Sequence, residues 1–135
     1  MNQFAKLAAL SMLAAPLLAA CTTMSSADAP QLTGTEWRFV SIDGAAPVSD
    51  KAQLGFMADR ISATAGCNGM GGNWSMDGDT LIGGPYASTM MFCEGLMEQE
   101  RAIGQLLEEK PTVALTGDRL TLTSATNKAE LVRAN

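Results

Sequence analysis

AGCNGMGG at residues 65–72 and TMMFC at residues 89–93 are the two stretches around which this sequence is organised. The first surrounds Cys67 and Asn68 with four glycines, and the second places Cys93 immediately before a helical pattern. The chain holds one other cysteine, which lies close to the N-terminus. We therefore expect Cys67 and Cys93 to lie side by side in the fold.

The N-terminus has the pattern of a bacterial lipoprotein signal. Lys6 precedes an apolar run over residues 7–20, which is short for a bilayer span because about 20 apolar residues are needed. The run ends in Leu-Ala-Ala-Cys at residues 18–21, which resembles a lipobox, where the chain is cut before an acylated cysteine. The sequence thus predicts a lipoprotein signal peptide over residues 1–20 and lipidation of Cys21. The alternative is an ordinary signal peptide with a fortuitous cysteine.

The residues after Cys21 predict a tethered, acidic domain. Residues 21–33 are mostly small and polar, which is typical of a flexible tether, so we expect the folded domain to cover residues 34–135. Without residues 1–20, which include Lys6, 14 acidic side chains oppose eight basic ones for a net charge of −6. This charge disfavours nucleic acid as a partner, and it makes the lipid the expected means of membrane attachment. In enteric lipoproteins, an aspartate directly after the lipidated cysteine favours the inner membrane. Thr22 occupies this position here, so we expect the outer membrane, with the domain facing the periplasm.

Counting cysteines predicts a disulfide. With Cys21 lipidated, Cys67 and Cys93 remain in an oxidising compartment where disulfides persist. A bridge between them closes a loop of about 27 residues, which stabilises the fold by roughly 3.5 kcal/mol in the chain-entropy model. The alternative is a pair of free, buried thiols.

The remaining sequence predicts a mainly β (α+β) fold with about eight short strands. Alternating, β-branched or aromatic segments separated by turn signals place the strands at residues 35–42, 53–57, 60–64, 73–76, 80–82, 112–115, 120–123 and 129–133. Eight short strands in about 100 residues avoid exposed edges best by forming a small barrel. We expect the single helix to cover one opening or one face of this barrel.

The helix is expected near residues 94–110. Pro111 ends it, and four apolar residues share one face: Leu96, Ile103, Leu106 and Leu107. Glu100 falls within this apolar stripe. Its carboxylate either lies at the solvent edge of the stripe or is buried with hydrogen-bond donors, because an unpartnered buried carboxylate is strongly disfavoured.

Several chemistries are excluded or disfavoured. The absence of histidine removes His-based acid–base and nucleophile chemistry and most zinc sites. The glycines at 69, 71 and 72 lack the spacing of a nucleotide-binding loop, and they predict positive φ or close backbone approach. Asn68 either bonds neighbouring backbone or presents its amide to a ligand. We expect no cofactor and no metal.

Methionine provides the single soft-ligand signal. The residues concerned lie near the two cysteines: Met70, Met76, Met90 and Met91. Thioethers and thiolates select Cu(I). Methionine is also a common filler of small cores, and a disulfide removes the thiolates, so copper binding is a minor alternative.

Three short elements of the sequence form a known combination. They are Gly34-Thr35-Glu36-Trp37 with Gly44, then Gly66-Cys67-Asn68-Gly69, and then Thr89-Met90-Met91-Phe92-Cys93 followed by Glu100. Together they resemble the META domain, the HslJ-like family of bacterial lipoproteins, over residues 34 to about 133. The resemblance implies a small β-barrel-like sheet with one helix, a cell-envelope location, a role in stress and novobiocin tolerance, and no enzymatic activity or cofactor. Met91-Phe92 is bulkier than the small residue often found there.

The leading functional hypothesis is a monomeric, lipid-anchored envelope protein with a non-enzymatic binding or scaffolding role. Its candidate structural or binding residues are Trp37, Asn68, Gly69 and Glu100. The second hypothesis is an inhibitor that inserts the loop at residues 68–73 into an envelope hydrolase or protease. The third is an enzyme that uses helix carboxylates, but acidic residues on a helix usually form a solvated face. Those carboxylates are Glu94, Glu98 and Glu100.

Overall fold

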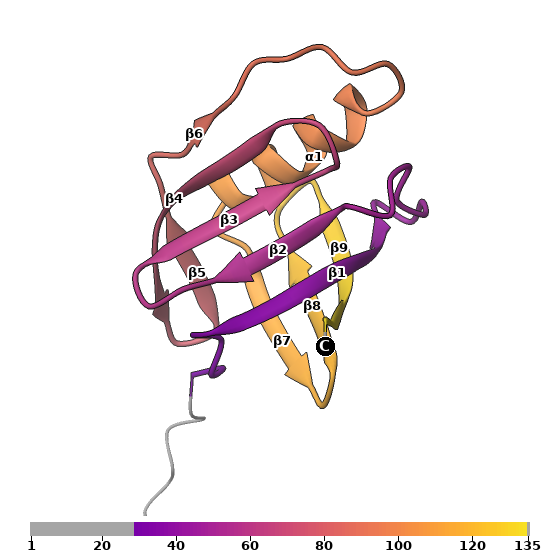
Figure 1. Cartoon of the computed structure of the whole chain (residues 1–135). Helices are drawn as coiled ribbons and strands as arrows, with labels where there is room; N and C mark the ends of the chain where they lie inside the picture. Colours follow the sequence, from indigo (N-terminus) through magenta and orange to yellow (C-terminus); the bar gives the residue numbers. More distant parts are fainter. Residues whose placement is uncertain (1–28, 135) are drawn as a thin grey trace, which may run out of the picture.

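Eight β-strands close into a barrel, and one helix lies across one end of it (Figure 1). The computed structural model describes residues 29–134. The barrel strands are β1 (Thr35–Ile42), β2 (Gln53–Phe56), β3 (Arg60–Thr64), β4 (Gly69–Asp77), β5 (Thr80–Gly83), β7 (Thr112–Thr116), β8 (Arg119–Thr123) and β9 (Lys128–Arg133). A short strand, β6 (Ala87–Ser88), and the helix α1 (Met97–Glu108) complete the fold. The mainly β class and the barrel predicted from the sequence are confirmed.

The strands run in the order β3-β2-β1-β9-β8-β7-β5-β4, and β4 pairs with β3 to close the barrel. All pairs are antiparallel. Closure is weakest between β5 and β7, where Thr80 and Thr112 form the sole registered pair. β6 lies outside the closed ring and pairs with β4 at Met70 and Gly71. β6 therefore attaches the segment before the helix to the barrel through its pairing with β4.

The core fills the barrel and continues beneath the helix. In β1, Trp37 and Phe39 point inward, as strand alternation requires. The pairing of β1 with β9 shifts register between Phe39 and Ser41, and this bulge allows Ile42 to point inward as well. The helix contacts β1, β3 and β5, which lie on different sides of the barrel, and it buries Ile103, Leu106 and Leu107 there. The helix therefore covers an opening of the barrel.

The structure moves the predicted start of one strand. β4 begins at Gly69 rather than at residue 73, because Gly71 and Gly72 lie within the strand. A Cβ atom at Gly72 would lie 2.7 Å from the Pro85 carbonyl oxygen, so glycine is needed for this close approach. Gly69 shows neither a positive φ nor a close neighbour, so the glycine interpretation is wrong at that position. The predicted set of strands also lacked β6.

The helix is shorter than the expected range 94–110. Gly95 has φ +79°, and the Leu96 N–H donates to the Cys93 carbonyl in a turn that precedes the helix. At the other end, Lys110 has φ +54°. Both conformations are incompatible with a continued right-handed helix.

The folded part begins before residue 34. Leu32 is buried in the core, and its carbonyl accepts hydrogen bonds from the Thr35 N–H and hydroxyl. The end of the expected tether over residues 21–33 thus packs against the barrel. The predicted signal peptide and the lipidation at Cys21 lie outside the described residues. In the part of the chain that the structure describes, no helix has the length and apolar character needed to cross a membrane.

Candidate functional site

A disulfide joins Cys67, in the turn between β3 and β4, to Cys93, which lies a few residues before the helix α1. Cys67 and Cys93 are bonded, their Cα atoms are 6.0 Å apart, and both side chains are partly buried. The predicted pairing is confirmed, and the alternative of two free thiols is wrong. This bridge is one of two attachments that hold residues 89–93 to the barrel.

The second attachment is the Asn68 side chain, which is 1% exposed. Its Nδ2 donates to the Met91 carbonyl at 2.8 Å and to a Glu100 carboxylate oxygen at 2.7 Å. Its Oδ1 accepts from the Met91 N–H at 2.7 Å and from the Thr89 hydroxyl at 2.9 Å. Every hydrogen-bonding position of the amide is used, as a buried polar group requires. Of the two interpretations of Asn68, the structure favours the one in which its amide binds backbone.

Glu100 completes this arrangement from the helix. Its carboxylate accepts from the Asn68 backbone N–H at 3.2 Å as well as from Nδ2, and it is partly buried. Glu100 therefore has the hydrogen bonds of the second expected environment, but it is half-buried rather than buried. Both hydrogen bonds link the helix to a turn of the barrel, which gives the carboxylate a structural role.

Gly69 extends the attachment through its backbone. The Gly69 N–H donates to the Thr89 hydroxyl at 3.2 Å, and the Thr89 N–H donates to the Gly69 carbonyl at 3.1 Å. Asn68, Gly69 and Glu100 thus belong to one cluster with residues 89–91. We call this group, with the disulfide, the Asn68 clamp.

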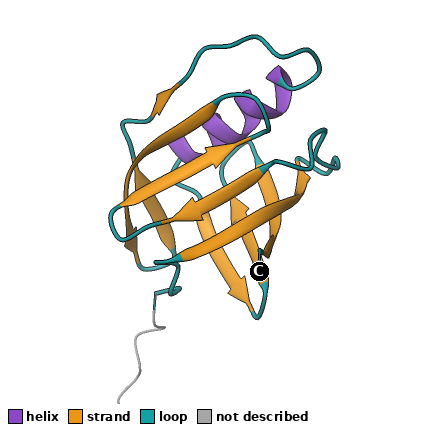
Figure 2. Ribbon diagram, in the orientation of Figure 1, coloured by secondary structure: helices purple, strands orange, loops and turns teal. Residues whose placement is uncertain are grey.

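Three exposed apolar side chains project from the clamped segment. Met90 is 93% exposed, Met91 60% and Phe92 82%. Because both hydrogen-bonding groups of the Met91 backbone face Asn68, the backbone lies toward the barrel and the side chains lie in solvent. Figure 2 shows the long loop between β6 and α1, to which this stretch belongs. We call Met90–Phe92 the apolar loop.

Sequence reasoning treated these residues as a motif and as candidate copper ligands, and it did not identify them as a surface. One signal was available: three consecutive large apolar residues stand outside any helical or strand period, directly before a bridged cysteine. The copper alternative is not supported, because the disulfide takes both thiolates and Met70 is buried in the core.

Trp37 does not belong to the Asn68 clamp. Its indole is fully buried in β1, and its N–H donates to the Thr35 hydroxyl at 2.7 Å. The Arg133 guanidinium lies 4.6 Å from the ring centroid in a cation–π contact. Trp37 therefore stabilises the core rather than forming part of a binding surface.

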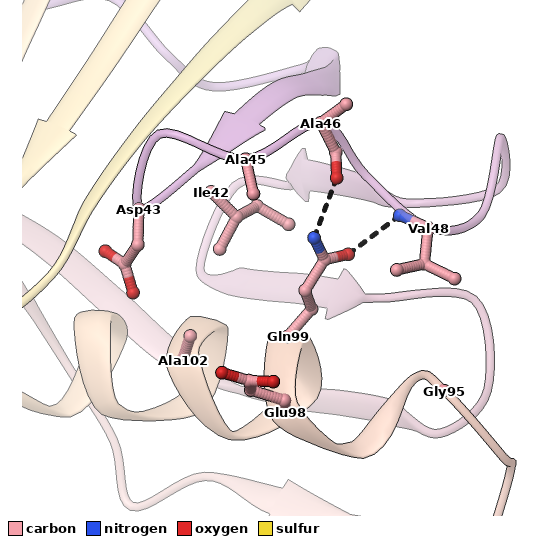
Figure 3. A pocket seen from close by; sticks show the side chains of 9 residues that line it. All are labelled: Ile42, Asp43, Ala45, Ala46, Val48, Gly95, Glu98, Gln99 and Ala102. Atoms are coloured by element: carbon pink, nitrogen blue, oxygen red, sulfur yellow. Dashed lines mark hydrogen bonds between the residues drawn. The ribbon is translucent and has the colours of Figure 1, made fainter.

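A cleft lies between the β1–β2 connection and the helix (Figure 3). It has a volume of about 320 Å³, and Gln99 reaches across it to donate to the Ala46 carbonyl at 2.8 Å and to accept from the Val48 N–H at 2.9 Å. Gln99 was missed by sequence reasoning, because its partners lie about 50 residues away. The amide fastens the β1–β2 connection to the helix.

The helix acids do not form a catalytic pair. Glu94 is exposed and Glu100 is held by Asn68, whereas Glu98 lines the cleft together with Asp43. The Asp43 carboxylate already accepts from the Asn127 amide and the Lys128 N–H. Within residues 29–134, no three His, Cys, Asp or Glu side chains are grouped so that they could hold a metal ion.

Comparisons with known proteins agree with the fold. Two solved NMR structures are similar to this chain. One is 27% identical with a TM-score of 0.67 and covers 75% of this chain and 90% of its own. The other, from Burkholderia xenovorans, is 18% identical with a TM-score of 0.57, covers 77% and 84%, and bears on the fold alone.

Among curated proteins, none matches this sequence. The model of the META domain matches residues 30–135, which include the buried Leu32, the Asn68 clamp and the apolar loop. The META domain is not a known enzyme family. The predicted resemblance is confirmed: this chain belongs to the META domain family.

Proposed function

We propose that this protein is a non-enzymatic docking domain of the cell envelope, which binds a partner protein through the apolar loop. The observation that carries the proposal is that the side chains of this loop are exposed although its backbone is held in place. Met90, Met91 and Phe92 lie in solvent, while the Met91 backbone between them is held by a fully hydrogen-bonded asparagine and the adjacent Cys93 is held by a disulfide. Contiguous exposed apolar side chains mark interaction sites more often than isolated ones do.

The energetics favour this role. Complete burial of a Phe or Met side chain is worth about 1.5–3 kcal/mol, so three such residues supply a substantial binding energy when a partner covers them. A loop that is ordered before binding loses less conformational entropy when it binds. The clamp therefore increases the affinity that the three side chains can provide.

The proposed partner is a protein with an apolar pocket bordered by basic residues. Glu94 and Glu98 are exposed close to the loop in sequence, and the domain is acidic overall. Basic groups on a partner would be attracted to these carboxylates. Anionic lipid headgroups would instead be repelled, so a membrane surface is a poor occupant.

The position of the loop also disfavours the anchoring membrane. The loop between β6 and α1 and the N-terminal end of the described chain, just before β1, lie at opposite ends of the barrel (Figure 1). A tether to Cys21 would therefore leave the domain at the end opposite the loop, and the loop would point away from the leaflet that holds the lipid.

The anchor itself is part of the proposal. The lipobox-like residues 18–21 support lipidation of Cys21, and Thr22 supports the outer membrane with the domain in the periplasm. A role in envelope stress or antibiotic tolerance is supported by the family resemblance. Intact mass of the chain isolated from membranes tests the anchor, because cleavage before Cys21 and acylation change the mass together.

An envelope hydrolase or protease is a second candidate partner, which the domain would inhibit. A loop held at a disulfide on a rigid barrel has the preorganisation that inhibitory loops need. The segment at residues 68–73, which was expected to insert into the partner, lies largely in β4, where its residues pair with β3 and β6. The apolar loop is therefore the better candidate for the inserted segment. Inhibition of the captured partner by the purified chain would favour this candidate.

Site-specific photo-crosslinking tests the docking function. A photoreactive residue replaces Phe92 in the full chain, and a second chain carries it at Met57, an exposed apolar residue outside the clamp. We expect a discrete protein adduct from position 92 and none from position 57. Adducts with lipid at position 92, or the same adducts from both positions, would contradict a protein-docking role.

A further inference from the structure

The tip of the apolar loop carries two thioethers. We propose that Met90 and Met91 are a methionine-oxidation site, and that their sulfoxide forms release the partner protein. This inference rests on the proposed docking function and adds its regulation. Its motivation is that the two most exposed methionines of the described residues lie in the loop, at 93% and 60%.

Other sulfur atoms of the described residues compete poorly for an oxidant. Both cysteines in this range are in the disulfide, so they offer no thiolate, which would otherwise react first. Met70 is buried, and Met76 and Met97 are partly buried. The Met97 sulfur also accepts the Cys93 N–H at 3.4 Å. Met57, which is 51% exposed, is the sole comparable methionine outside the loop in this range.

The oxidant is a hypohalous acid or a peroxide. With hypochlorous acid, the thioether sulfur attacks the chlorine, the oxygen–chlorine bond breaks with release of hydroxide, and water then displaces chloride to form the sulfur–oxygen bond. Chloride leaves with the bonding electrons and a net proton is released, so sulfur is oxidised and chlorine is reduced. With a peroxide, the oxygen–oxygen bond breaks and water or an alcohol leaves. Each step converts an apolar thioether into a polar sulfoxide.

Oxidation would change binding without changing the fold. The clamp holds Met91 through its backbone N–H and carbonyl, and it uses neither thioether. A sulfoxide oxygen in an apolar pocket lacks a donor, and an unsatisfied buried polar group weakens an interface. We expect each sulfoxide to weaken binding several-fold. Phe92 cannot be oxidised in this way, so residual affinity should remain.

The test begins with the order of oxidation. The purified full-length chain is treated with graded hypochlorous acid, and peptide mapping by mass spectrometry locates each added oxygen. We expect Met90 and Met91 to be oxidised before Met57, and Met70 last. The circular dichroism spectrum should stay unchanged when only the loop is oxidised. Oxidation of Met57 or Met70 ahead of the loop would overturn the site.

The second measurement is the yield of the protein adduct from a photoreactive residue at position 92. Oxidised chain should give a several-fold lower yield than untreated chain, and methionine sulfoxide reductase should restore it. A Met90→Leu, Met91→Leu double variant keeps the loop apolar and should be insensitive to the oxidant. An unchanged yield after loop oxidation would overturn the regulation while leaving docking intact. Absence of the adduct from untreated chain would instead contradict the docking function.

Discussion

At the scale of single residues, Asn68 holds the segment that presents the apolar loop. Its amide makes four side-chain hydrogen bonds, two of them to the Met91 backbone and one each to Thr89 and Glu100. A buried asparagine with every position occupied specifies one conformation of the segment that it binds. The orientation of Met90 and Phe92 toward solvent follows from this amide.

Replacement of Asn68 by alanine should lower the free energy of unfolding by about 1–3 kcal/mol, because groups of Met91 and Glu100 lose buried partners. Asn68→Asp should cost more at pH 7, since its carboxylate would face that of Glu100. Urea unfolding measures both effects.

A double-mutant cycle isolates the contact between these two side chains. Glu100→Gln in the Asn68→Asp background should recover part of the lost stability, because a glutamine amide can donate to the new carboxylate. Additive effects of the two substitutions would show that the side chains do not interact.

At the scale of elements, the connections between strands and helix are fastened by a few side chains. The Cys67–Cys93 bridge joins the β3–β4 turn to the start of the helical region, with a stabilisation of roughly 3.5 kcal/mol in the chain-entropy model. Gln99 fastens the β1–β2 connection, and Glu109 fastens the turn between β8 and β9. The helix is therefore attached to the barrel at three loops as well as through its apolar face.

Glu109 makes the stability of this last attachment depend on pH. Hydrogen bonds from Ser124, Thr126 and Gln105 hold the pKa of its carboxyl below the ordinary value of 4.5. A carboxyl with a lowered pKa in the folded state stabilises the fold above its unfolded pKa, and this stabilisation is lost as the pH falls through the folded pKa. Glu109→Gln should therefore be less stable than the parent at pH 7, and the difference should shrink below pH 4.5.

Urea unfolding from pH 7 down to pH 3 checks this prediction. Glu94→Gln serves as the control for loss of one negative charge, because Glu94 is exposed and has no hydrogen-bond partner among the described residues. A stability difference between Glu109→Gln and the parent that does not vary with pH would contradict the role of the carboxylate.

At the scale of the whole molecule, the barrel separates the end at which the described chain begins from the end that carries the proposed docking loop. The described chain enters β1 at one end of the barrel, and the loop between β6 and α1 lies at the other, beside the helix that covers the opening (Figure 1). A lipid at Cys21 would thus hold the domain so that Met90–Phe92 face away from the anchoring leaflet. This arrangement suits a protein that meets partners in the periplasm.

Much of this architecture could be predicted from the sequence. The strands alternate regularly, and the two cysteines of the domain had no other partners. The start of β4 was missed because glycines disfavour strands, and their presence at positions 71 and 72 reflects a close approach that is visible only in three dimensions. The exposure of Phe92 was missed because apolar residues are normally buried. It depends on contacts between Asn68 and residues more than 20 positions away, which have no local signature.

The affinity of the captured partner for variants of the full chain tests the central claim most directly. The protein that crosslinks to position 92 is purified, and its dissociation constant is measured for the parent, Phe92→Ser and Met57→Ser. Loss of a buried Phe side chain should weaken binding about tenfold or more, whereas Met57→Ser should leave it unchanged. Equal affinities for the parent and Phe92→Ser would contradict the claim that the apolar loop is the docking surface.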